Sequence, residues 1–226
     1  MIERNDFTVL HEPFSYLYYV QNEGATIAQQ YIDPNHPTDY AGIRSHIIDT
    51  AAKQPVFFKD MCSHCFSELR SDNRFLRRLT NTFLIRDPAK AIASYYAMNP
   101  AVTIEEIGLK QLCGIYEQTK SLGEIPIVID ADDLENNPEG IFYAYCKALG
   151  IRFIGEALTW EPEHKQQWEI WKDWHRDASK STGIKKNVEK FAITINNSDH
   201  LRSLYEDQMI YYQILHADRL KPQLRK

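Results

Sequence analysis

Four short apolar runs recur along the chain, and each is followed by polar or turn-forming residues and then by a helical pattern. The runs are 7–10 (FTVL), 56–59 (VFFK), 82–86 (TFLIR) and 126–130 (PIVID). Their apolar character is nearly continuous rather than alternating, which is typical of strands covered on both faces of a parallel sheet. Because these strands alternate with helices, the pattern predicts an α/β fold.

Capping residues predict where the helices begin and end. Asp87 followed by Pro88 is an N-cap and first-turn pair, so a helix over about 88–98 should follow the third strand directly, with Ile92 on its buried face. The same pairing of a polar cap with proline recurs near the middle of the chain.

Asn137 and Pro138 form this second start signal, and Gly150 is placed to end the helix in a left-handed conformation. A last amphipathic pattern predicts a packing helix over about 198–216. Because no repeat or linker interrupts the pattern, we expect a single domain over 1–226.

Composition narrows the function classes. The chain has 226 residues, of which 43% are hydrophobic and 25% charged, as in an ordinary globular protein. Its net charge of -5 gives no overall field that would hold nucleic acid or an anionic membrane surface. The charged start lacks the apolar core of a signal peptide, and only four cysteines occur, so we expect a cytoplasmic protein.

The segment 83–96 (FLIRDPAKAIASYY) carries the most chemical information. Arg86 ends a strand at the edge where parallel sheets bind ligands, and it stands beside a helix N-terminus. Its guanidinium suits a phosphate, and Ser94, about two turns along the helix, can donate another hydrogen bond. Alternatively, Arg86 pairs with a carboxylate and Ser94 is a solvated helix serine; spacing alone leaves both open.

This segment resembles the 3′-phosphate-binding segment of the sulfotransferases that use 3′-phosphoadenosine-5′-phosphosulfate (PAPS). In both, R-D-P is followed by five residues and a serine. The resemblance implies that Arg86 and Ser94 bind the 3′-phosphate. It also implies PAPS as co-substrate without a metal, a small-molecule acceptor, and a three-layer αβα fold of the P-loop kinase-like type with a mainly parallel sheet.

Further segments resemble a bacterial and plant branch of these proteins in the same order. They are 11–14 (HEPF), 56–61 (VFFKDM), 128–151 and the STG at 181–183. By this resemblance Ser181, Thr182 and Gly183 form a loop over the nucleotide; the alternative is a solvated basic loop.

One departure from the family concerns the start of the sequence. Family members open with a strand and a phosphate loop, whereas this sequence begins MIERNDF, near the end of the helix that follows that loop. The missing strand normally lies between the strands that match 56–59 and 82–86. We expect upstream codons to add about 20 to 40 residues; the alternative is a remnant with impaired transfer.

Three side chains are candidates for the transfer chemistry. Lys59 resembles a lysine that one branch of the family has just before its catalytic histidine, but that histidine falls at Met61 here. His64 can replace it as the base, or can be a polar residue at a helix start. Glu12 follows the first strand at the same sheet edge, and is either a base or a carboxylate stabilised by a helix dipole.

Two other functions remain open. The C-x-x-C of Cys62 and Cys65 follows a strand, as in thiol redox proteins, in which a helix N-terminus lowers the thiol pKa. A protein that keeps the nucleotide fold without catalysis is the other alternative. The acidic run 130–133 (DADD) is expected to cap a turn through Asp132 or Asp133 rather than to bind a metal.

Overall fold

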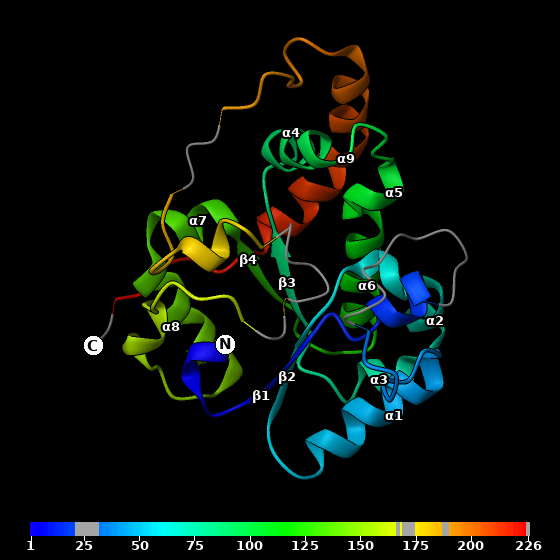
Figure 1. Cartoon of the computed structure of the whole chain (residues 1–226), viewed down its shortest axis with the longest axis vertical. Coiled ribbons are helices and arrows are strands. Elements are labelled where there is room, and N and C mark those ends of the chain that lie inside the picture. The colour runs from blue at the N-terminus through cyan, green and yellow to red at the C-terminus, as the bar shows by residue number, and fades with distance from the viewer. Residues whose placement is uncertain (21–31, 166–167, 169–174, 187–189, 225–226) are drawn as a thin grey trace. The chain divides into compact units, whose positions relative to one another are not determined.

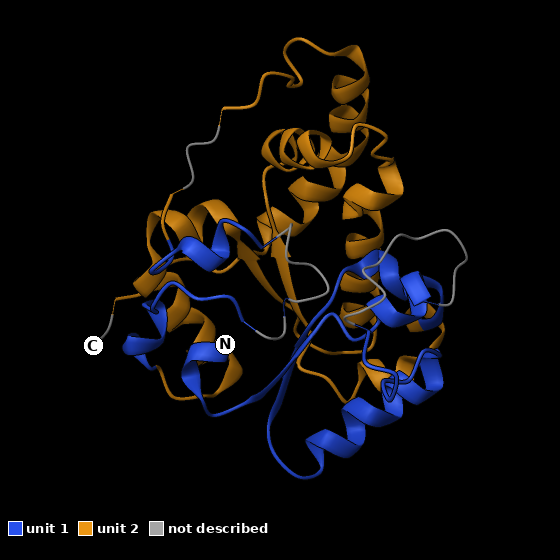
Figure 2. Ribbon diagram, in the orientation of Figure 1, with its two compact units in different colours: residues 1–68, 154–184 blue, residues 69–153, 185–226 orange. Residues whose placement is uncertain are grey.

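The computed structural model describes residues 1–20, 32–165, 168, 175–186 and 190–224 (Figure 1). The chain divides into two compact units (Figure 2). Unit 1 comprises Met1–Glu68 and Ile154–Ile184, and unit 2 comprises Leu69–Phe153 and Lys185–Lys226. Each unit contains one small parallel sheet, and helices predominate in the described chain, so the fold is a mixed α/β fold.

Unit 1 is built on the parallel pair of strands β1 (Thr8–His11) and β2 (Val56–Lys59). The register pairs Thr8 with Val56 and His11 with Lys59, so both strands end at the same edge. The helix α1 (Tyr40–Ala51) precedes β2 and contributes the buried side chains of Ile43 and Ile47. The described short helical turns of this unit include Ile2–Arg4, Tyr16–Val20, Cys62–His64, Gly155–Leu158 and Ala178–Lys180.

Unit 2 is built on the parallel pair β3 (Thr82–Ile85) and β4 (Ile127–Asp130). Ile85 pairs with Asp130, so the residues that follow these two strands also share an edge. The helices of this unit are α3 (Asn73–Leu76), α4 (Pro88–Met98), α5 (Ile104–Ile107), α6 (Leu109–Ser121), α7 (Ala131–Asn136), α8 (Pro138–Leu149) and α9 (Asp199–Ala217). The helix α2 (Phe66–Ser71) contains the boundary between the units.

The position of α4 follows from a cap at one end and a buried face along its length. The Asp87 carboxylate accepts a hydrogen bond from the Ala89 backbone N–H at 2.8 Å, which satisfies a helix-start donor. Ile92 is fully buried and packs with Leu201 and Leu204 of α9. Because α4 is held by its cap at Asp87 and by the packing of Ile92, the end of β3 leads directly into an ordered helix.

The predicted elements agree closely with the structure. The segment 56–59 is a strand, and the helix 88–98 has the predicted bounds. The strands expected at 82–86 and 126–130 are one residue shorter at one end, and the strand expected at 7–10 is shifted by one residue to Thr8–His11. Gly150 ends α8 with a φ of 67°, as its left-handed role requires. The last helix, expected over 198–216, runs from Asp199 to Ala217 with Ser198 as its cap.

One predicted cap is wrong. The expectation was that Asp132 or Asp133 caps the turn after the fourth strand, but the capping side chain is Asp130, which accepts hydrogen bonds from the backbone N–H groups of both. The last strand residue therefore starts α7 itself.

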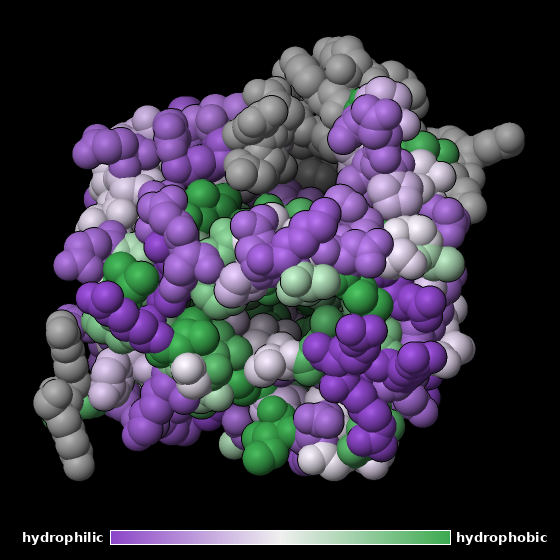
Figure 3. Space-filling view, turned by 90° about the horizontal axis from the view of Figure 1, so that it is seen from below, coloured by the Kyte–Doolittle hydropathy of each residue, from purple (hydrophilic) through white to green (hydrophobic). Residues whose placement is uncertain are grey.

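In the view of Figure 3, hydrophobic residues form groups among hydrophilic ones. Among the residues that the structure describes, no helix has both the length and the apolar character needed to cross a bilayer.

Candidate functional site

Arg86 lies in unit 2, immediately after β3, where the expected phosphate site begins. Its side chain is partly buried, and no hydrogen bond or ion pair joins it to another described residue. The alternative in which Arg86 pairs with a neighbouring carboxylate is therefore not found in the described chain. A guanidinium that has lost part of its water without gaining a partner favours binding of an anion.

Ser94 lies in the second half of α4, eight residues beyond Arg86. It is partly buried, and its hydroxyl makes no side-chain hydrogen bond to another described residue. The face that packs on α9 is built on Ile92, two residues away, so Ser94 stands on a different side of the helix. Both members of the predicted pair thus keep their donors available.

An ion pair links the helices that follow the two strands of unit 2. Lys90 Nζ lies 2.7 Å from each carboxylate oxygen of Asp132, so it joins the first turns of α4 and α7. Asp130, which is almost fully buried, accepts a 2.9 Å hydrogen bond from the Tyr212 hydroxyl. Burial, followed by the hydrogen bond to Asp130, raises the pKa of Tyr212. These contacts fix the edge of the sheet beside Arg86.

Glu12 and Lys59 meet in unit 1 at the end of the strand pair. The Lys59 ammonium donates a hydrogen bond to Glu12 Oε1, and the Glu12 backbone N–H donates to the Lys59 carbonyl at 2.7 Å. Burial alone would raise the pKa of Glu12, but the charge and hydrogen bond of Lys59 outweigh it and lower that pKa. The Glu12 side chain is thus an ion-paired carboxylate. Its backbone has a φ of 49°, and Glu12 is not part of a helix start.

His64 is buried and is held by an aspartate that the sequence did not indicate. His64 Nδ1 lies 2.6 Å from Asp60 Oδ1, and the side chains of His64 and Asp60 are 4% and 9% exposed. Burial raises the pKa of Asp60, while its hydrogen bonds from His64 and Phe14 act in the opposite direction. The histidine is thus a buried, hydrogen-bonded side chain that lies just before α2.

A pocket of about 230 Å³ opens beside His64 within unit 1. It is lined by Leu17, Tyr18, Ser63, His64, Phe66, Ser67 and Glu68. Tyr18 and Tyr19 place their rings 5.3 and 5.4 Å from the imidazole, measured between ring centroids. The pocket therefore combines aromatic walls with hydroxyl, imidazole and carboxylate groups.

A second histidine contact at this sheet edge was also missed. His11 Nε2 and His175 Nε2 lie 2.9 Å apart, and His11 Nε2 lies 3.9 Å from Glu12 Oε1. Burial, with smaller effects of Lys59 and His175, lowers the pKa of His11 to about 4. Burial likewise lowers the pKa of His175. The two imidazoles are therefore neutral partners near pH 7.

Ser181, Thr182 and Gly183 lie in unit 1, where the chain is tied to the segment before it. The Ser181 hydroxyl accepts from the Trp160 indole N–H at 3.0 Å and donates to the Ala178 carbonyl at 2.7 Å. Gly183 forms an isolated antiparallel bridge with Thr159. A side chain at Gly183 would meet the Leu158 carbonyl at 3.0 Å, so glycine permits this close approach. The loop is anchored, and the Ser181 hydroxyl is already engaged.

The cysteines of the C-x-x-C segment do not have the electrostatics of a redox site. Burial, followed by the nearby Asp60 carboxylate, raises the pKa of Cys62 to about 12 and also raises that of Cys65. Reactive dithiols require a lowered pKa. No group of three or more histidine, cysteine or acidic side chains in the described chain is arranged to hold a metal ion.

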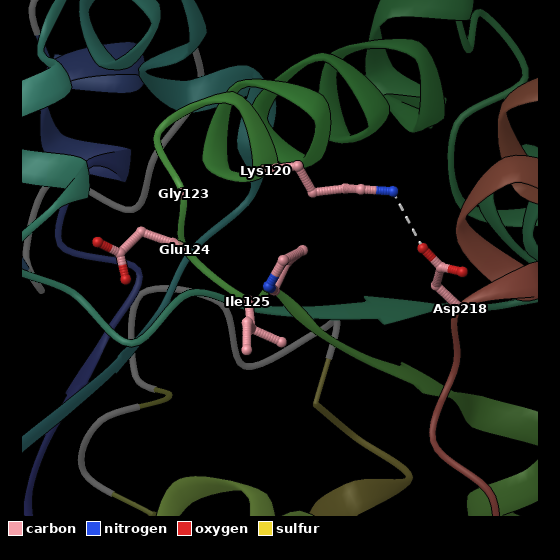
Figure 4. A pocket seen from close by; sticks show the side chains of 6 residues that line it. Lys120, Gly123, Glu124, Ile125 and Asp218 are labelled. Atoms are coloured by element: carbon pink, nitrogen blue, oxygen red, sulfur yellow. Dashed lines mark hydrogen bonds and ion pairs between the residues drawn. The ribbon is translucent and has the colours of Figure 1, made fainter.

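Unit 2 has a separate pocket of about 440 Å³ at the other end of β4 (Figure 4). Its lining includes Lys120, Glu124, Ile125 and Asp218, and Lys120 Nζ lies 3.2 Å from Asp218 Oδ2. Because the lining residues Glu124 and Ile125 come just before β4 in the chain, the pocket lies at the amino end of that strand. Ligands of parallel sheets bind at the carboxyl ends, so Arg86 and not this pocket marks the expected site.

The family of the chain follows from comparison with known proteins. A model of the sulfotransferase domain matches residues 1–218, so the chain belongs to the sulfotransferase domain family. No solved structure matches the chain.

Two curated relatives come from Arabidopsis thaliana. The chain is similar to a branched-chain-amino-acid aminotransferase-like protein 2, with 28% identity over 80% of this chain and 32% of that protein. It is also similar to a branched-chain-amino-acid aminotransferase-like protein 1, with 29% identity over 64% of this chain and 26% of that protein. The matches thus span about a third or less of these relatives.

Proposed function

We propose that the chain has sulfotransferase chemistry: it binds PAPS and transfers the sulfuryl group to a small-molecule acceptor. The observation that carries this proposal is Arg86, a cation at the end of β3 with no hydrogen-bond or ion-pair partner among the described residues. Membership of the sulfotransferase family supports the choice of ligand. The aminotransferase-like names belong to proteins of which the match covers a third or less, so we base the proposal on the family.

In this proposal Arg86 and Ser94 bind the 3′-phosphate of the nucleotide. The guanidinium supplies a fixed charge and paired N–H donors, and the first turn of α4 adds backbone N–H groups and partial positive charge. Ser181, Thr182 and Gly183 belong to a loop over the nucleotide, and their backbone groups are better suited to contact it than the engaged Ser181 hydroxyl.

Lys59, Glu12 and His64 serve the transfer step in unit 1. The Lys59 ammonium stabilises developing negative charge, as cationic donors do in group transfer. Of the two candidate bases, His64 is better suited than Glu12. Glu12 is engaged by Lys59, and its lowered pKa makes it a weaker base, whereas a base works best when its pKa is near the working pH.

We also infer that the two strand pairs belong to a three-layer αβα sheet of the P-loop kinase-like sulfotransferase fold. Each pair is parallel, and β1 pairs with β2 while β3 pairs with β4. These are the pairings that the family order gives on either side of its own first strand.

The proposal is tested by titrating the chain with adenosine 3′,5′-bisphosphate, the product of PAPS, in a calorimeter. We expect binding that Arg86→Ala weakens by about 2 to 4 kcal/mol, because a phosphate charge loses its partner. Arg78→Ala is the matched control, since Arg78 is an exposed arginine of the same unit. Absence of binding by the folded chain would overturn the proposal; binding without transfer to any acceptor would favour the non-catalytic alternative.

A further inference from the structure

The hydrogen bonds of Asp60 determine which nitrogen of His64 carries a proton. Asp60 Oδ2 accepts from the Phe14 backbone N–H at 2.6 Å, and Oδ1 accepts from the Met61 backbone N–H at 2.9 Å. Both oxygens thus act as acceptors from groups that can only donate. The 2.6 Å contact between Asp60 Oδ1 and His64 Nδ1 then places the proton on Nδ1. This leaves the lone pair of neutral His64 on Nε2.

The surroundings of His64 hold the ring while leaving that second nitrogen open. The rings of Tyr18 and Tyr19 both pack against the imidazole, one tilted by 32° and the other edge-on at 76°. No hydrogen bond joins Nε2 to any residue in the described parts of the chain. The ring also lines the 230 Å³ pocket. A buried imidazole with one nitrogen fixed and the other unbonded beside a pocket is arranged as a general base.

We propose that Asp60 is a positioning residue for His64, and that the two form the base of an acceptor site for hydroxyl compounds in this pocket. The inference deepens the proposed function and rests on it. His64 Nε2 takes the proton of the acceptor hydroxyl, and the hydroxyl oxygen forms a bond to the sulfur of PAPS. The bond from sulfur to the bridging phosphate oxygen breaks, and adenosine 3′,5′-bisphosphate leaves with that electron pair. The imidazolium then returns the proton to water.

The pocket lining indicates the kind of acceptor. Ser63 and Glu68 place a hydroxyl and a carboxylate group at the pocket, while Leu17 and Phe66 supply an apolar part. A polyhydroxylated acceptor such as a sugar can pair with these groups, whereas an apolar phenol would leave them unpaired at a cost in binding. The volume of about 230 Å³ fits a single small ring rather than an extended ligand.

The test reads the protonated nitrogen of His64 directly. The chain is labelled with ¹⁵N-histidine, and NMR correlations between ring nitrogens and carbon-bound protons are recorded above pH 7, with His64→Gln assigning the signals. We expect the Nδ1–H tautomer in the unmodified chain, the Nε2–H tautomer in Asp60→Asn, and recovery of Nδ1–H in Asp60→Glu. Asp49→Asn, at an exposed aspartate of α1, is the control and should leave the tautomer unchanged.

The acceptor class is read in the same samples by adding glucose or p-cresol and following the backbone signals of Ser63 and Ser67. We expect saturable shifts with glucose that exceed those with p-cresol. The reverse order would overturn the acceptor class. An Nε2–H tautomer in the unmodified chain would overturn the pair itself, and this outcome does not depend on the folding of any Asp60 variant.

These outcomes are separable from failure of the proposed function. A chain that does not bind adenosine 3′,5′-bisphosphate overturns the proposed function, whatever the tautomer of His64. A chain that binds the nucleotide but shows the Nε2–H tautomer keeps the proposed function and overturns the positioning role of Asp60.

Discussion

The pairing of Lys59 with Glu12 shows how a partly exposed cation keeps a buried carboxylate charged. Glu12 has lost most of its water, and burial by itself would favour the neutral acid. Lys59 reverses this effect by charge attraction and a hydrogen bond. The two groups are therefore coupled, and removing the charge of Lys59 changes the pKa of Glu12.

We predict that Lys59→Met lowers the free energy of unfolding by about 1 to 3 kcal/mol at pH 7, because it leaves the Glu12 carboxylate buried without its charge partner. Urea unfolding followed by circular dichroism measures the effect. Lys53→Met is the control, since Lys53 is exposed just after α1. Equal stability of the two variants would show that the pair contributes nothing.

His11 should make the folded state sensitive to acid. Its pKa is about 4 in the folded chain, against about 6.5 for an unfolded histidine. Between these values the unfolded chain binds more protons, so stability falls as the pH is lowered from 6.5 toward 4. The charged and titratable groups that face His11 are Glu12, Lys59 and His175, and the last two disfavour a positive charge there.

We therefore predict that His11→Gln loses less stability than the unmodified chain when urea unfolding is repeated at pH 7 and pH 5. His200→Gln, at an exposed histidine of α9, should behave like the unmodified chain. A His11→Gln chain that loses as much stability as the unmodified chain contradicts this assignment.

At the scale of elements, the cap of α4 connects stability with the expected phosphate site. Asp87 satisfies a backbone donor at the start of the helix and stands beside Arg86. We predict that Asp87→Ala lowers the free energy of unfolding by about 0.5 to 2 kcal/mol, whereas Asp87→Ser, which keeps a capping oxygen, loses less. Thermal and urea unfolding measure both, and an equal loss in the two variants would mean that capping is not the cause.

The sequence predicted elements better than it predicted contacts between them. The strand at 56–59 and the helix at 88–98 were predicted because caps, proline and apolar runs act locally. The capping role of Asp130 was missed because three acidic residues compete within one short run. Capping propensity does not distinguish Asp130 from Asp132 and Asp133, whereas the backbone geometry of the folded chain does.

The same limit applies to the candidate site. Arg86 and Ser94 could be proposed from the sequence because one segment contains both, and His64 because it lies near a strand end. The role of Asp60 depends on Phe14, 46 residues away, and His175 contacts His11 from 164 residues away. No periodicity or motif carries such long-range pairings, so only the folded chain reveals them.

At the scale of the whole molecule, each unit carries its own part of the proposed chemistry. Unit 2 holds Arg86 and Ser94, and unit 1 holds Lys59, Glu12 and the Asp60–His64 pair. The sulfotransferase family model matches residues in both units. The central claim is that Arg86 recognises the 3′-phosphate of the nucleotide.

That claim is tested most directly by comparing two ligands on two forms of the chain. Calorimetric affinities for adenosine 3′,5′-bisphosphate and adenosine 5′-monophosphate, which lacks the 3′-phosphate, are measured with the unmodified chain and with Arg86→Ala. The account predicts a clear preference for the bisphosphate in the unmodified chain and its loss in the variant. Equal affinities in the unmodified chain, or a preference that survives the loss of Arg86, would contradict it.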